Sequence, residues 1–102
     1  MASLVIVNAA GRRKQIPIGV GAMVMGRHDD CDIHVPEIHV SRRHCTITIN
    51  DELLQVQDLS SRNGTFVNNQ KVEKAALADG DKLRLGHVVF WVEDEQVVNL
   101  DV

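Results

Sequence analysis

The sequence predicts an all-β protein, an antiparallel sandwich or barrel made of many short strands. Val and Ile make up about a fifth of the 102 residues, and β-branched side chains favour strands. Apolar residues recur with a period of two wherever a pattern can be read. Turn dipeptides such as Asn63-Gly64 and Asp79-Gly80 interrupt this pattern at short intervals, which is typical of antiparallel sheets.

The alternation defines the strands in chain order. In the first half, strands are predicted at residues 4–8, 14–18, 23–27 and 32–35. The clearest strand follows, where Cys45, Ile47 and Ile49 alternate with two threonines, so one face of that strand, Cys45 included, is expected to point into the core.

The second half continues in the same way, with one exception. Strands are predicted around residues 54–57, 65–67, 70–72, 83–85 and 88–92. Both alternating sets of the 88–92 strand are apolar, which predicts that it is covered on both faces. The segment VEKAALA at 72–78 is compatible with a short helix or a loop, and residues 94–102 with a last strand or a tail.

Chain length, composition and net charge limit the number of domains and the kinds of partner that are expected. One domain is expected over residues 1–102, with its core at about 3–93, because 44% of the residues are hydrophobic. A net charge of -3 argues against nucleic acid or an anionic membrane as partner. The apolar run at 4–7 is too short for a signal peptide, and no stretch reaches the roughly 20 apolar residues of a membrane helix. With its two cysteines expected to be reduced, the chain is predicted to be cytoplasmic.

Three polar segments adjoin predicted strands: Gly26-Arg27, the SRRH segment Ser41 to His44, and the SSRNG segment Ser60 to Gly64. Loops gather at the ends of a sandwich, so these segments are expected to converge. Arginine forks, a serine hydroxyl and an asparagine amide suit a phosphoryl group whose carrier also has backbone amides and carbonyls to satisfy. The three segments therefore predict a phosphopeptide-binding surface.

These motifs resemble, in order and approximate spacing, the motif set of forkhead-associated (FHA) domains. The match includes LSSRNGTFVN at 59–68 and runs from about Met23 to Val92. The resemblance implies a β-sandwich of about eleven short strands with its binding loops at one end. It also implies a module that recognises phosphothreonine in a partner protein, without catalysis, cofactor or metal.

Position by position, the resemblance implies a phosphate contact for Arg27 and a hydroxyl hydrogen bond to the phosphate from Ser41. Arg42 falls where relatives often place a further phosphate ligand, and Arg62 falls beside the phosphate. Asn63 falls where the family holds the peptide backbone next to the phosphothreonine.

Four further positions match the family's motif. Gly26, His44 and Gly64 correspond to architectural positions: a close backbone approach, a buried side chain that braces the binding loop, and a tight turn. His39 lies where some relatives read the third residue after the phosphothreonine.

Some of the same residue types also occur in catalytic dyads and in zinc sites. Ser41 and His44 suggest a nucleophile–base dyad, but no G-x-S-x-G elbow accompanies them. Cys31 and His34 have a ligand-like spacing without a matching second pair among the remaining candidates His28, His39, His44 and Cys45, so no zinc site is predicted. A phosphate-independent interaction, or self-association through a sheet face, remains the alternative function.

Overall fold

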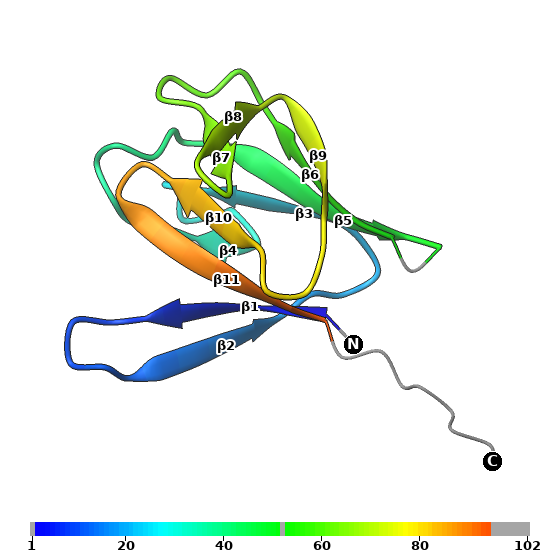
Figure 1. Ribbon diagram of the computed structural model, residues 1–102. Coiled ribbons are helices and arrows are strands. Elements are labelled where there is room, and N and C mark those ends of the chain that lie inside the picture. The colour runs from blue at the N-terminus through cyan, green and yellow to red at the C-terminus, as the bar shows by residue number, and fades with distance from the viewer. Residues whose placement is uncertain (1, 52, 95–102) are drawn as a thin grey trace, which may run out of the picture.

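The computed structural model describes residues 2–51 and 53–94, which form two packed β-sheets (Figure 1). Eleven strands lie in this part of the chain, as the resemblance implied. They are β1 (Ala2–Val7), β2 (Arg13–Pro17), β3 (Gly21–Gly26), β4 (Ile33–His34), β5 (Cys45–Asn50), β6 (Leu53–Asp58), β7 (Thr65–Val67), β8 (Gln70–Val72), β9 (Lys74–Leu77), β10 (Lys82–Leu85) and β11 (Val88–Asp94).

The first sheet has the order β2-β1-β11-β10-β7-β8 and the second the order β4-β3-β5-β6-β9. The pairings are antiparallel, as predicted, apart from the short parallel contact of β3 with β4. The β-sandwich is therefore confirmed over a barrel. Within the described residues, no helix has the length and apolar character needed to cross a bilayer.

The core lies between the sheets and follows the predicted alternation. Cys45, Ile47 and Val56 are fully buried, so the inward orientation of Cys45 is confirmed. From the facing sheet, the buried side chains include Leu4, Leu83, Leu85, Phe90 and Val92.

The turns use positive φ where the sequence placed Asn and Gly. Asn68 (φ 49°) and Asn69 (φ 69°) form the two-residue turn that joins β7 to β8. Gly86 (φ 57°) opens the turn between β10 and β11, where Leu85 pairs with Val88. Both turns have the twist that closes antiparallel hairpins.

Two sequence expectations were wrong. Lys74–Leu77 is a strand rather than a short helix or loop, because β9 pairs with β6 and buries Leu77. Local helix propensity is weak and yields to such pairing. The outer face of β11 is also open, since Trp91 is 45% exposed. Of the predicted tail at 94–102, Asp94 ends β11 and the rest lies outside the described residues.

Candidate functional site

The end of β3 and the loop before β5 run side by side. Arg27 N–H donates to Ser41 O (2.9 Å), His28 N–H to Arg42 O (3.1 Å), and His44 N–H to Met25 O (2.8 Å). The SRRH segment thus continues the β3–β5 pairing beyond the sheet edge.

Gly26 lies at the closest point of this contact. A Cβ placed on Gly26 would sit 2.1 Å from Arg42 O, and this neighbour is backbone that cannot swing aside. Any side chain at position 26 would force the SRRH segment away from β3.

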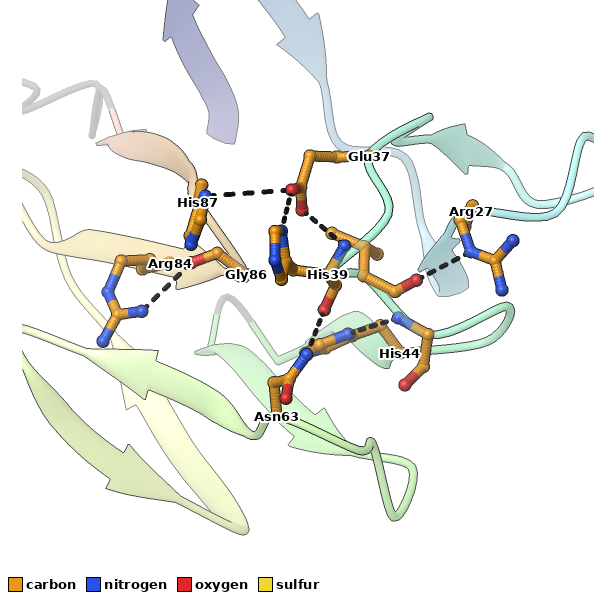
Figure 2. A network of polar contacts seen from close by, with 10 residues as sticks. Arg27, Glu37, His39, His44, Asn63, Arg84, Gly86 and His87 are labelled. Atoms are coloured by element: carbon orange, nitrogen blue, oxygen red, sulfur yellow. Dashed lines mark hydrogen bonds and ion pairs between the residues drawn. The ribbon is translucent and has the colours of Figure 1, made fainter.

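His44 joins this segment to the SSRNG loop. Its side chain is completely buried, and its Nδ1 accepts the N–H of Ser41 (3.1 Å). Since Nδ1 is the acceptor, Nε2 carries the ring proton and donates to Gly64 O (2.8 Å). Figure 2 shows the bond from the ring to the backbone of the SRRH segment. Gly64 itself has φ 90°, which favours glycine.

Two further side chains connect the same loops. Ser41 Oγ accepts the N–H of Arg62 (2.9 Å), so its hydroxyl proton stays available for a ligand. Asn63 Nδ2 donates to His39 O (2.8 Å), as Figure 2 shows, and its Oδ1 remains free to accept. The loops are therefore positioned before any ligand arrives.

The arginines differ in how they are held. Arg27 Nε donates to Val40 O (3.0 Å), and Figure 2 shows the rest of the guanidinium projecting past this bond. Arg43 Nη2 donates to Asp30 Oδ2 (3.0 Å), which pairs its charge. Arg27 therefore keeps two terminal nitrogens for a ligand, whereas Arg43 is engaged at the surface.

These loops enclose a hollow of about 340 Å³. It brings together all of the predicted ligand-contacting residues; the full lining is Arg27, Ile38, His39, Val40, Ser41, Arg42, Arg43, Arg62 and Asn63. Of the described residues, four arginines and no carboxylate line it, although the chain as a whole is acidic. Such a concentration of guanidinium groups suits a multiply charged anion.

Comparison with known proteins agrees with this geometry. The family model of the FHA domain matches residues 23–86. This chain belongs to the FHA family. It is 40% identical over 85 residues to the FHA domain-containing protein FhaA of Mycobacterium tuberculosis, and 44% identical over 61 residues to the glycogen accumulation regulator GarA of Mycolicibacterium smegmatis. The matches cover 83% and 60% of this chain, but only 16% and 39% of those proteins.

Solved FHA domains share the whole fold. One, from a structural and functional analysis of phosphothreonine-dependent FHA domain interactions, superposes with a TM-score of 0.84 at 36% identity. The match covers 94% of this FHA domain and 98% of that chain. The FHA domain of FhaA in complex with the intracellular domain of Rv3910 gives a TM-score of 0.82 at 36% identity, covering 91% and 100% of the two chains.

Sequence reasoning missed Asp58, whose carboxylate holds the SSRNG loop of this FHA domain in place through hydrogen bonds. Asp58 Oδ1 accepts the hydroxyls of Ser61 (2.5 Å) and Thr65 (2.7 Å), and Oδ2 accepts Ser61 N–H (3.1 Å). Ser61 Oγ in turn accepts the N–H of Gly64 (3.0 Å). Partial burial acts to raise the pKa of Asp58, but the hydrogen bonds from Ser61 and Thr65 outweigh it and hold that pKa below its usual value.

A sequence signal for this arrangement exists. Asp58 directly follows the strand predicted at 54–57, with Ser61 three residues later and Gly64 closing the turn, a spacing at which a carboxylate caps following N–H groups. The loop that carries Arg62 and Asn63 is therefore ordered by a residue that does not line the hollow.

Ser41 and His44 do not form a nucleophile–base dyad in this FHA domain. The family is a recognition module rather than an enzyme family. His44 Nδ1 bonds to the backbone of Ser41, while the Ser41 hydroxyl bonds to the backbone of Arg62. A serine–histidine dyad requires a hydroxyl-to-imidazole bond, and neither group is directed to one.

The cysteine candidates for zinc are dispersed. Burial and the nearby Asp30 raise the pKa of Cys31, whose thiol donates to Arg42 O (3.2 Å). Burial raises the pKa of Cys45 to about 12, as expected for a small core side chain. His34 lies against Arg27 O (3.1 Å). Both thiols are free, and neither joins a cluster of ligands among the described residues.

Proposed function

We propose that this domain recognises phosphothreonine in a partner protein through the hollow lined by Arg27, Ser41, Arg42, Arg62 and Asn63. The observation that carries the proposal is the convergence of four arginines, a serine hydroxyl and an asparagine amide on one hollow of an acidic chain. A phosphothreonine has a charge of about -1.5 to -2 and three acceptor oxygens, which these donors match.

Each group has a role consistent with its contacts. The free nitrogens of Arg27 and the hydroxyl of Ser41 bind phosphate oxygens, joined by Arg42, with Arg62 at the side. Each hydrogen bond to a charged group contributes roughly 1.5–3 kcal/mol, so two or three of them distinguish phosphate from a bare hydroxyl. Asn63, held by His39 O, presents its free Oδ1 to a peptide N–H.

Gly26 and His44 contribute to binding by holding the two loops in position, and not by contacting the ligand. Gly26 permits the close approach of the SRRH segment, and His44 fixes both loops through Ser41 and Gly64. His39 also lines the hollow, and we assign to it contact with peptide residues beyond the phosphothreonine.

The relatives support this proposal. The similar solved structures come from phosphothreonine-dependent FHA interactions and from FhaA bound to the intracellular domain of Rv3910. Mycobacterium tuberculosis EmbR, 28% identical, was solved with a low-affinity phosphopeptide. We extend the proposal to a single domain over residues 1–102 and, on the two free buried thiols, to a cytoplasmic location.

A titration of the purified chain against degenerate peptide pools tests the proposal. The pools carry a fixed central phosphothreonine, phosphoserine or unphosphorylated threonine. We expect binding to the phosphothreonine pool, with weaker or no binding to the other two. Equal binding to the phosphorylated and unphosphorylated pools would contradict a phosphate site.

One observation favours the alternative of a phosphate-independent contact. Trp91 is 45% exposed on the outer face of β11, where Val89 is half-buried beside it. Exposed tryptophan is common in protein interfaces. Binding of a partner that survives phosphatase treatment but is lost in Trp91→Lys would support this face over the hollow.

A further inference from the structure

Three side chains with metal-ligating atoms meet beside the hollow. Glu37 Oε1 lies 2.5 Å from His39 Nδ1 and 4.0 Å from His87 Nδ1. The two imidazole rings are stacked, with centroids 4.0 Å apart. Figure 2 shows both histidines facing the Glu37 carboxylate, and one ligand atom from each of the three lies within 4.8 Å of the others.

The fold brings these residues together from distant parts of the chain. Glu37 and His39 precede the SRRH segment, whereas His87 lies in the turn between β10 and β11. Gly86 makes the contact tight: a Cβ there would sit 2.6 Å from Glu37 Oε2 and 2.9 Å from His39 Cβ. The turn packs directly against the Glu37–His39 segment because position 86 has no side chain.

The donor set is that of a transition-metal site. Imidazole nitrogen and carboxylate oxygen bind Zn²⁺ at about 2.0–2.2 Å, and tetrahedral ligands at that range lie about 3.3 Å apart. The two separations from Glu37 Oε1, 2.5 Å and 4.0 Å, lie on either side of that value, so small side-chain rotations reach it. The other carboxylate oxygen, Oε2, accepts the N–H of His39 (3.1 Å), the outer contact that orients a ligating carboxylate.

Exposure leaves room for the ion and a further ligand. The side chain of His87 is 74% exposed and that of His39 is 47% exposed, while Glu37 is mostly covered at 22%. The Glu37 carboxylate is therefore the least exposed ligand of the cluster, and the two histidine rings face the solvent. Three protein ligands with an exposed fourth position match the pattern of open zinc sites.

We propose that Glu37, His39 and His87 form a binding site for a divalent transition-metal ion of the zinc class. The proposal departs from the sequence expectation of no metal, and of the sequence's zinc candidates it uses only His39. It does not depend on the phosphothreonine proposal. A bound ion would tie the β10–β11 turn to the segment whose His39 carbonyl holds Asn63.

The test is a calorimetric titration of the untagged, chelator-treated chain with zinc chloride, without peptide. We expect one equivalent of Zn²⁺ to bind, and His87→Ala and Glu37→Gln each to weaken binding at least about tenfold, since each removes or neutralises a ligand. His28→Ala is the matched control, because His28 is also half-exposed and lies beside two carboxylates, Asp29 and Asp30.

The outcomes distinguish a specific zinc site at Glu37, His39 and His87 from nonspecific zinc binding. Unchanged affinity in His28→Ala, together with zinc-induced NMR shifts of the His39 and His87 ring nitrogens, supports the proposal. Absence of zinc binding, wild-type affinity in His87→Ala, or equal weakening in His28→Ala overturns it. Circular dichroism of each variant confirms that it is folded.

Discussion

Among the arginines of the hollow, Arg27 has the geometry that best suits the proposed phosphate ligand. Its Nε is bound to Val40 O, which holds the guanidinium in place while its terminal nitrogens stay free. Neither Arg42 nor Arg62 has a side-chain hydrogen bond of this kind within the described part of the chain. A pre-positioned fork loses less freedom when it binds, so Arg27 is expected to contribute most.

Arg27→Ala is expected to weaken phosphothreonine-peptide binding by about 2–5 kcal/mol, the range for truncating one member of a buried charge pair. Arg43→Ala is the control, since Arg43 also lines the hollow but is paired with Asp30, and its loss is expected to cost less than about 1 kcal/mol. Isothermal titration with one phosphopeptide measures both. Equal losses would show that only general positive charge matters.

At the scale of elements, the SSRNG loop depends on Asp58. The carboxylate accepts bonds from Ser61 and Thr65, and loop residues Arg62 and Asn63 lie in the chain between Ser61 and Gly64, which are hydrogen-bonded to each other. Asp58→Asn is expected to lower the free energy of unfolding by about 1–3 kcal/mol at neutral pH and to weaken phosphopeptide binding as well.

The pH dependence of this loss has a definite sign. Because the folded-state pKa of Asp58 is lowered below 3.8, its stabilisation is present above the unfolded pKa and is lost as pH falls through the folded pKa. The difference in thermal midpoint between the wild type and Asp58→Asn should therefore become smaller below about pH 4. A difference that stays constant down to about pH 2 would contradict the linkage. Asp29→Asn, at an 87% exposed side chain, serves as the control.

Strand β9 provides a second test at this scale. Leu77 is 4% exposed and pairs with Leu54 across the sheet, whereas Leu53 on β6 is 46% exposed. Leu77→Ala should lower the unfolding free energy by about 2–5 kcal/mol, and Leu53→Ala by less than about 1 kcal/mol. Urea denaturation measures both. A small effect at Leu77 would mean that β9 is not a packed strand.

For the molecule as a whole, the charge distribution predicts that this domain does not bind nucleic acid. The net charge is -3, while the positive side chains at the hollow are confined to one end of the sandwich. A fluorescence titration should show no binding of duplex DNA or single-stranded RNA at protein concentrations that saturate a phosphothreonine peptide. Micromolar binding at physiological salt would contradict this expectation.

The sequence alone predicted most of the sandwich because its strands are amphipathic, and a period of two is visible in one sequence. Cys45, Ile47 and Val56 show this directly, since their alternation matched their burial. Most of the residues that line the hollow were also identified, because arginine, serine and asparagine stand in three short motifs, whereas Ile38, Val40 and Arg43 were not. Their role in binding phosphate stays a prediction.

What only the tertiary structure decided depended on contacts between distant segments. Lys74–Leu77 is a strand because β6 offers it an edge, and Trp91 is exposed because no further layer within residues 2–51 and 53–94 covers the outer face of β11. The Glu37–His39–His87 cluster could not be identified from sequence, since His87 meets the other two residues only through loop packing. Periodicity is a local property that a sequence records, whereas a polar network depends on which loops the completed sheets bring together.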